Sequence, residues 1–91
     1  MNFTWDEKKN LNNIKKHKIS FVQAAYIFSD PLRREYYDKK HSKLDEARTI
    51  AIGMAENRIL FVSFTEPDSA TIHIISARKA KKHERKIYEK N

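Results

Sequence analysis

The chain has 91 residues, a formal net charge of +7 and a pI near 9.7, which suits one domain with one modest core. It has no cysteine, so disulfides, thiol catalysis and thiolate metal sites are excluded. No apolar run reaches the ~20 residues that span a bilayer, and the first ten residues do not resemble a signal peptide. We therefore expect one cytoplasmic domain over residues 1–91, and its basic charge favours RNA, DNA or an acidic protein as partner.

The first third of the chain predicts one short strand and two helices. Residues 2–5 (NFTW) have strand character, and Asp6 is placed to cap a helix over residues 6–18. Ser20 is placed to cap a second helix over residues 21–28, in which large and small apolar residues recur at helical spacing. A proline then ends this helix, because the residue before a proline avoids the helical region.

The rest of the chain predicts four strands and a final helix. β-branched and aromatic residues favour strands over residues 32–38, 47–55, 59–66 and 71–78. A basic helix follows over residues 80–90. Short connections make consecutive strands antiparallel neighbours, so the predicted class is α+β: a short N-terminal strand, two helices, an antiparallel meander sheet and a C-terminal helix.

The last predicted hairpin brings two arginines together. If its turn is formed by residues 67–70, Arg58 faces Arg78 across the strand pair. Two like charges this close favour an anion between them, and the forked guanidinium donors match phosphate oxygens. The alternative is structural, with each arginine paired to a helix carboxylate such as Glu84.

A second charged group, Glu46, Arg48 and Glu66, falls at the opposite end of the predicted sheet. A strand of about six residues spans ~20 Å, so this group and the Arg58–Arg78 pair are not expected to share one phosphate. We interpret the second group as a structural ion pair at the sheet edge. The functional alternative makes Glu66 a general base with Arg48 beside it.

The chain ends in a basic run that the helix dipole does not explain. From residue 78 onward, seven lysines and arginines stand against two glutamates. Cations are favoured near a helix C-terminus, but several of these lysines precede or begin the helix, which indicates an anionic partner. Exposed aromatic side chains can also stack on RNA bases. The residues predicted to contact RNA are Lys79, Lys81, Lys82, Arg85 and Tyr88.

His17 is the histidine that we consider for acid or base catalysis. It follows Lys16 at the end of the first predicted helix, and histidine titrates near neutral pH. A histidine there can instead be a partner of the helix dipole. The other histidines are His41 in the polar loop, His73 in a strand and His83 in the last helix. No pair of histidines has the helical spacing that, with carboxylates, suggests a metal site, so we predict no metal and no cofactor.

The chain resembles the BrnT toxins of bacterial type II toxin–antitoxin pairs over nearly its whole length. Residues 3–31 are similar to the family's opening, where a W-D pair, a K-H pair and an F-x-x-A-x-x-x-F-x-D-P run recur. Residues 41–53 are similar to its H-S…E-x-R…I-G stretch. The most specific motif is the S-A-R-x-A-x-x-x-E-R-x-x-Y spacing, which residues 76–88 fit throughout. The turn near Pro67 departs from the family, which often has arginine or glycine after the glutamate.

This resemblance implies a RelE-like fold and a metal-free endoribonuclease that inhibits translation and growth. It also implies neutralisation by a BrnA-like antitoxin in a hetero-oligomer, with operator DNA bound only through the antitoxin. The RNA would supply its own nucleophile, the ribose 2′-hydroxyl, and the enzyme would orient it, move its proton and stabilise the phosphorane oxygens. The expected catalytic residues are, in order, Arg78, Arg58, Lys16, His17, Arg48 and Glu66.

Two other classes of function stay open at this point. A nucleic-acid-binding module without catalysis would bind RNA with a steep salt dependence and leave it uncut. An interaction protein would use its basic helix to meet an acidic antitoxin, with electrostatic steering speeding the encounter. The two roles can coexist, because an antitoxin can cover the surface that binds RNA.

Overall fold

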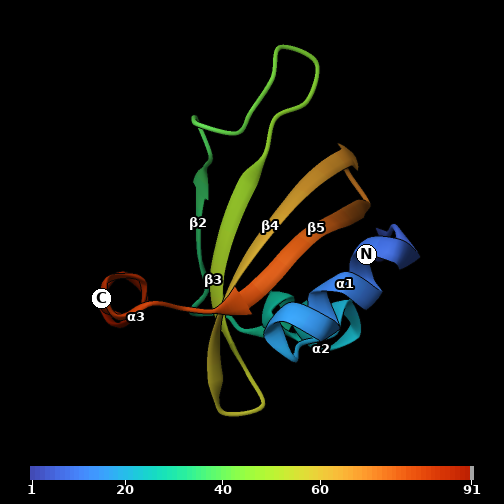
Figure 1. The fold of residues 1–91 in the computed structure, drawn as a ribbon. Coiled ribbons are helices and arrows are strands. Elements are labelled where there is room, and N and C mark those ends of the chain that lie inside the picture. The colour runs from blue at the N-terminus through green and yellow to red at the C-terminus, as the bar shows by residue number, and fades with distance from the viewer. Residues whose placement is uncertain (91) are drawn as a thin grey trace.

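The protein folds around one five-stranded sheet, which a computed structural model describes over residues 1–90 (Figure 1). The strand order is β1-β5-β4-β3-β2; the last four strands form an antiparallel meander, and β1 joins its β5 edge in parallel. The predicted α+β class is confirmed. The elements are β1 (Asn2–Trp5), α1 (Glu7–His17), α2 (Phe21–Ala25), the 3-10 helix η1 (Tyr26–Ser29), β2 (Arg34–Tyr37), β3 (Thr49–Ala55), β4 (Arg58–Asp68), β5 (Thr71–Lys79) and α3 (Lys82–Glu89).

Local sequence signals start the two N-terminal helices where they were predicted, although the second is α-helical only to Ala25 and continues as the 3-10 helix η1. The Asp6 carboxylate accepts hydrogen bonds from the backbone N–H groups of Lys8 and Lys9 at the start of α1. Ser20 and Gln23 form a reciprocal capping box at the start of α2. Each cap satisfies helix N–H groups that have no partner within the helix.

Helix α1 is attached to the sheet through an asparagine. Asn13 is buried; its Nδ2 donates to the backbone oxygens of Ile19 and Ala77 at 2.8 Å each, and its Oδ1 accepts from the N–H of Ala77 at 3.1 Å. The last pair between β1 and β5 is Trp5 with Ile74. Asn13 therefore completes the hydrogen bonding of the β5 edge where β1 has ended.

The sheet buries apolar side chains on both faces. On one face, Phe21, Ile27 and Phe28 from α2 and η1 pack against β3, β4 and β5, with Phe28 edge-on to Phe64 at 5.0 Å. Trp5 packs against the same cluster. The second face holds a smaller cluster that joins Ile50 and Ile52 of β3 to Ala80 and Tyr88. Helix α3 stands apart from α1 and α2 in Figure 1, beside β3.

Tyr88 belongs to this smaller cluster, so the prediction of an exposed base-stacking tyrosine is wrong. The residue is 8% exposed, and its hydroxyl donates to Asp30 Oδ2 at 2.6 Å. The hydrogen bond to Asp30, helped by burial and by the charge of Asp30, raises the pKa of Tyr88 to about 12. Tyr88 lies one helical turn after Glu84, the other buried residue of α3, and these two residues form the side of the helix that faces the protein.

The register of the last hairpin also differs from the prediction. Arg78 pairs with Phe61, three residues further along β4 than Arg58, and Arg58 instead pairs with Ala55 of β3. The hairpin strands continue to the pair Asp68–Thr71, and the β4–β5 register shifts twice on the way. Arg78 is therefore displaced by ~10 Å toward the centre of the sheet, at ~3.3 Å per residue. The predicted Arg58–Arg78 clamp does not form.

Candidate functional site

One cavity of about 370 Å³ combines the side chains of four strands with those of the loop between β2 and β3. Its volume lies within the ~300–1,000 Å³ range of small-molecule sites. Two guanidinium groups, an imidazole, a carboxylate, a phenol and two hydroxyl groups surround it. The lining residues are Tyr36, Asp38, His41, Arg48, Ile50, Phe61, Ser63, Ser76 and Arg78.

Strand register explains why these side chains share one face of the sheet. Ser63 pairs with both Ile50 and Ser76, and Phe61 pairs with Arg78. Directly paired residues project from the same side of a sheet, and alternate residues of a strand do so too. The two serines are small, so they leave space at the centre of the face that the larger side chains enclose.

Arg78 is held rigidly at one side of this cavity. Its Nη1 and Nη2 donate to the two carboxylate oxygens of Glu84 at 2.7 and 2.9 Å, and Nη1 also donates to the backbone oxygen of Lys79. The guanidinium lies over the Phe61 ring at 4.1 Å from its centroid. Hydrogen bonds among residues 1–90 thus use three of its five N–H donors. The structural partner considered for Arg78 is confirmed, and donors remain for a ligand.

Glu84 is a buried carboxylate that fixes this arrangement. It is 4% exposed, and its Oε1 also accepts a hydrogen bond from the N–H of Lys81 at the start of α3. Burial acts to raise the pKa of Glu84, but hydrogen bonds from Arg78 and Lys81 outweigh it, and the pKa lies below its usual value. The same bond to Glu84 raises the pKa of Arg78 against the effect of burial. The pair therefore stays ionised and hydrogen-bonded.

Arg48 supplies the second guanidinium of the cavity, just before β3. Its Nε donates to Glu46 at 3.2 Å, so within the predicted group of Glu46, Arg48 and Glu66 the ion pair joins Arg48 to Glu46 and not to Glu66. Arg48 and Arg78, which the sequence placed at opposite ends of the sheet, line one cavity. The register shift that moves Arg78 away from the β3–β4 turn brings it toward Arg48.

The loop between β2 and β3 carries three of the lining residues and has an ordered base. The N–H of Asp38 donates to the backbone oxygen of Arg48 at 2.8 Å. Ser42 joins the same two residues, since its hydroxyl donates to the Asp38 oxygen at 2.7 Å and accepts from the Arg48 N–H at 2.9 Å. The Asp38 carboxylate in turn lies 2.9 Å from His41 Nδ1. The loop therefore fixes the backbone of Asp38 against that of Arg48 and holds the Asp38 carboxylate beside the His41 imidazole.

Tyr36 is a partly exposed aromatic ring at the cavity, on the β2 edge of the sheet. Burial, followed by the negative charges of Glu84 and Asp38, raises its pKa, while Arg78 acts in the opposite direction. Its hydroxyl therefore stays protonated at neutral pH. The ring offers a surface on which a nucleobase can stack.

Four of the predicted catalytic residues lie away from this cavity. Arg58 sits at the β3–β4 turn, 4.0 Å from Glu56. Glu66 lines a different cavity, with Glu46 and His73. Lys16 and His17 are exposed at the end of α1. Helix α1 is hydrogen-bonded through Asn13 to Ala77, and Ala77 is buried in the core cluster on the sheet face opposite the cavity.

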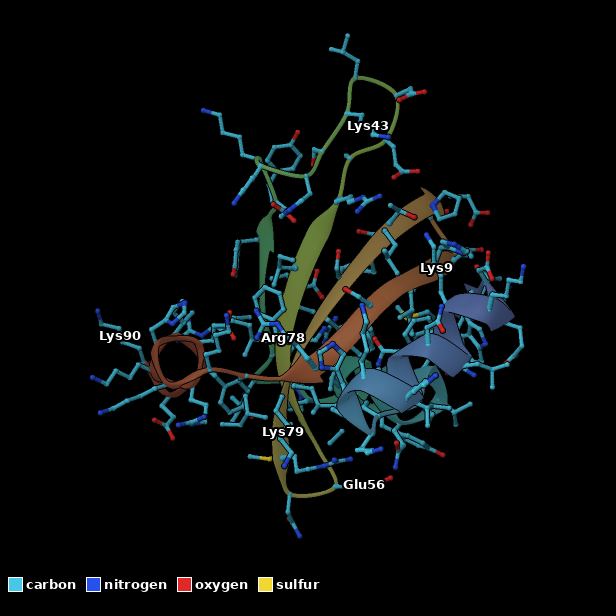
Figure 2. The ribbon with its side chains drawn as sticks, viewed as in Figure 1. Lys9, Lys43, Glu56, Arg78, Lys79 and Lys90 are labelled. Atoms are coloured by element: carbon cyan, nitrogen blue, oxygen red, sulfur yellow. The ribbon has the colours of Figure 1, made fainter. Side chains whose placement is uncertain are left out.

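The predicted RNA contacts of the basic run are exposed, except for Tyr88. Arg78 and Lys79 leave β5 in different directions (Figure 2), as the alternation of a strand requires. Lys81, Lys82 and Arg85 lie on the solvent side of α3. These residues surround the end of the sheet with positive charge and are not lining residues of the cavity.

Sequence reasoning missed Asp38, His41, Ser63 and Ser76 as site residues. One available signal was the single serine that interrupts each of two apolar strands, in VSF and IIS. Another was the spacing of Asp38 and His41, three residues apart in a turn. Within residues 1–90, no group of three or more His, Cys, Asp or Glu side chains is arranged to hold a metal ion, and no helix is long and apolar enough to cross a membrane.

Comparisons with known proteins place these features in a family context. A family model described as "Ribonuclease toxin, BrnT, of type II toxin-antitoxin system" matches residues 5–84. The crystal structure of the Brucella abortus ribonuclease toxin BrnT is similar to this chain, with a TM-score of 0.67 and 29% sequence identity. The match covers 90% of this chain and 99% of that one. A search of curated proteins found no significant match.

Proposed function

Because this chain belongs to the BrnT family of ribonuclease toxins of type II toxin–antitoxin systems, we propose that it cleaves RNA in the cavity lined by Arg48 and Arg78. The observation that carries the proposal is that Arg48 and Arg78 line one hollow together with His41, Asp38 and Tyr36. Forked guanidinium donors match the oxygens of a phosphodiester. The cleavage needs no metal ion, and in the cell it inhibits translation and growth.

In this proposal the two arginines stabilise the charge that develops at phosphorus. The ribose 2′-oxygen attacks the adjacent phosphorus, the bond from phosphorus to the 5′-oxygen breaks, and negative charge grows on the non-bridging oxygens. Arg78 is already fixed by Glu84 and Phe61, so little reorganisation accompanies the reaction. Removing one such donor typically costs ~3 kcal/mol of transition-state stabilisation.

Substrate binding is shared between the cavity and the surface around it. Tyr36 stacks on a base next to the scissile bond. The lysines around α3 attract the RNA backbone without reading its sequence, so each of them contributes little on its own. The RNA-binding side chains in this proposal, besides Tyr36, are Lys79, Lys81, Lys82 and Arg85.

We propose a BrnA-like antitoxin as the partner, bound in the cytoplasm in a hetero-oligomer that reaches operator DNA through the antitoxin. Family membership and the net charge of +7 support this. A basic toxin and an acidic segment of an antitoxin attract each other over a distance, which speeds association. An antitoxin that covers the cavity or the lysines around α3 would block access of RNA.

The test is incubation of the purified protein with RNA in the presence of EDTA. We expect fragments that end in a 2′,3′-cyclic phosphate or its hydrolysis product, and we expect the cognate antitoxin to suppress them. Protein that binds RNA with a steep salt dependence but leaves it intact would instead be a non-catalytic binding module. Cleavage that EDTA abolishes would refute the metal-free reaction.

A further inference from the structure

His41 and Asp38 form a bonded pair at the rim of the proposed site. His41 Nδ1 lies 2.9 Å from Asp38 Oδ2, and the backbone N–H of His41 donates to Asp38 Oδ1 at 3.2 Å. One carboxylate therefore contacts both the main chain and the ring of the same histidine. This arrangement fixes the direction of the imidazole, and both residues line the cavity that contains Arg48 and Arg78.

The pair also determines which ring nitrogen of His41 carries the proton. An ionised carboxylate can only accept hydrogen bonds, so the nitrogen that faces Asp38 must be the donor. In the neutral ring, Nδ1 then holds the hydrogen and Nε2 is left as an acceptor. A neutral imidazole with an acceptor nitrogen in a phosphate-binding cavity has the form that a general base requires.

The loop places this base relative to the arginines. Asp38 and Arg48 are joined by a direct backbone hydrogen bond and by the Ser42 hydroxyl, which contacts both. Arg48 is thus coupled to the element that orients His41.

We propose that His41 is the general base of RNA cleavage and that Asp38 is its positioning residue; the inference rests on the function proposed above. His41 Nε2 takes the proton of the ribose 2′-hydroxyl while the bond from the 2′-oxygen to phosphorus forms. The bond from phosphorus to the 5′-oxygen breaks, and that oxygen keeps the electron pair and takes a proton from water. The products are a 2′,3′-cyclic phosphate and a 5′-hydroxyl, and the imidazolium returns its proton to solvent.

His17, the histidine favoured by sequence alone, competes with His41 for this role. It is exposed at the end of α1 and does not line the cavity. The assignment therefore predicts that His41→Gln and His17→Gln differ sharply. His83→Gln is a second control: His83 lies on α3 with 73% of its side chain accessible and its Nε2 3.8 Å from Glu84, and it does not line the cavity.

The experiment measures single-turnover cleavage of a single-stranded RNA that the wild-type protein cuts at one mapped bond. We expect His41→Gln to cleave ~10²–10⁴-fold more slowly, the usual effect of losing a general base, with unchanged thermal unfolding. His83→Gln and His17→Gln should cleave like the wild type. Asp38→Asn should lower the single-turnover rate at saturating protein and leave unchanged the protein concentration that gives half of that rate, because an amide that donates to the ring disfavours the required tautomer. A purely structural role would move that concentration or the unfolding temperature.

A second substrate separates a base from an acid. In the same RNA, sulfur replaces the bridging 5′-oxygen at the mapped bond, and a thiolate leaves without needing a proton. If His41 is the base, His41→Gln stays impaired on this substrate. Full recovery would make His41 the acid and overturn the assignment.

The remaining outcomes separate this inference from the proposed function. A His41→Gln protein that cleaves at the wild-type rate, while Arg48→Ala is inactive, would refute the role of His41 and leave the site in place. Loss of cleavage in His17→Gln, with cleavage at the wild-type rate in His41→Gln, would likewise refute the role of His41. Wild-type protein that cleaves no RNA would refute both proposals.

Discussion

At the scale of single residues, Arg78 has two functions that one substitution cannot separate. It is proposed to bind phosphate, and it neutralises Glu84, which is 4% exposed. Breaking a buried ion pair from one side leaves an uncompensated charge. We expect Arg78→Ala to lose about 3 kcal/mol of unfolding free energy as well as cleavage, measured by urea denaturation and by RNA digestion.

Removing the charge of Glu84 at the same time separates the two functions. Arg78→Met combined with Glu84→Gln leaves no unpaired charge and keeps most of the buried volume, so it should recover much of the lost stability. Cleavage should stay at least ~10²-fold below wild type, because the phosphate ligand is still missing. Full activity in this stable double variant would remove Arg78 from the mechanism.

Tyr88 is a structural residue in this account. Tyr88→Phe removes the hydroxyl that donates to the Asp30 carboxylate at 2.6 Å and should cost about 1–2 kcal/mol, since hydrogen bonds to charged groups are worth more than neutral ones. Tyr37→Phe, at an exposed position of β2, serves as the control and should change nothing. An unfolding midpoint that stays fixed in Tyr88→Phe would contradict this structural role.

At the scale of elements, the attachment of α1 depends on the amide of Asn13. Asn13→Ala would leave the N–H and the backbone oxygen of Ala77 without the partners they have now. We expect a loss of about 2–3 kcal/mol, because unsatisfied buried backbone groups carry their full desolvation cost. Thermal unfolding measures this loss. Asn12, the neighbour of Asn13, is exposed on the same helix, so Asn12→Ala should hardly change the unfolding free energy in the same measurement. Equal effects of the two substitutions would contradict this attachment.

The elements themselves could be predicted from sequence, but their register could not. Asp6 and Ser20 predict where helices start, and runs of β-branched residues predict strands. Both signals depend only on neighbouring residues, so they can be read from the sequence. The register of β4 and β5 depends on two shifts and on strands that extend to Asp68 and Thr71, which no local pattern marks. Without these shifts, the predicted register placed Arg78 opposite Arg58, whereas Arg78 pairs with Phe61.

The site illustrates the same limit. Arg78 and Arg48 were both identified as candidate residues, but they were assigned to opposite ends of the sheet. The pairing of Asp38 with His41 depends on the fold of a polar loop that carries no periodic pattern. Tyr88 was misjudged because the partner of its hydroxyl, Asp30, lies far away in the sequence.

At the scale of the whole molecule, acid should destabilise the fold. Burial opposes ionisation of Asp30 and Glu84, but their hydrogen bonds outweigh it, and both pKa values lie below the usual ones. A lowered folded pKa gives stability that is present above the unfolded pKa of about 4 and is lost as pH falls through the folded value. The unfolding midpoint in urea should therefore be similar at pH 7 and pH 5 and clearly lower at pH 3.

The high positive charge of the chain adds to this acid effect. Protonation of the carboxylates removes the negative charges that offset the nineteen lysines and arginines. The net positive charge therefore rises, and the repulsion within the folded chain rises with it. Added salt should restore only the part that comes from this repulsion, and Glu84→Gln should show a smaller decrease at pH 3 than wild type. An unfolding midpoint that is unchanged or higher at pH 3 would contradict the assigned pKa shifts.

Two matched arginine substitutions test whether RNA is cleaved in the cavity that Arg48 and Arg78 line. Arg48 and Arg58 are similarly exposed, at 26% and 29% of their side chains, and each faces an exposed glutamate. Truncating either one should therefore change stability little. The measurement is the rate of RNA cleavage in EDTA by Arg48→Ala and Arg58→Ala. We predict a loss of at least ~10²-fold for Arg48→Ala and a wild-type rate for Arg58→Ala; the reverse result would place the site at the β3–β4 turn and contradict the account.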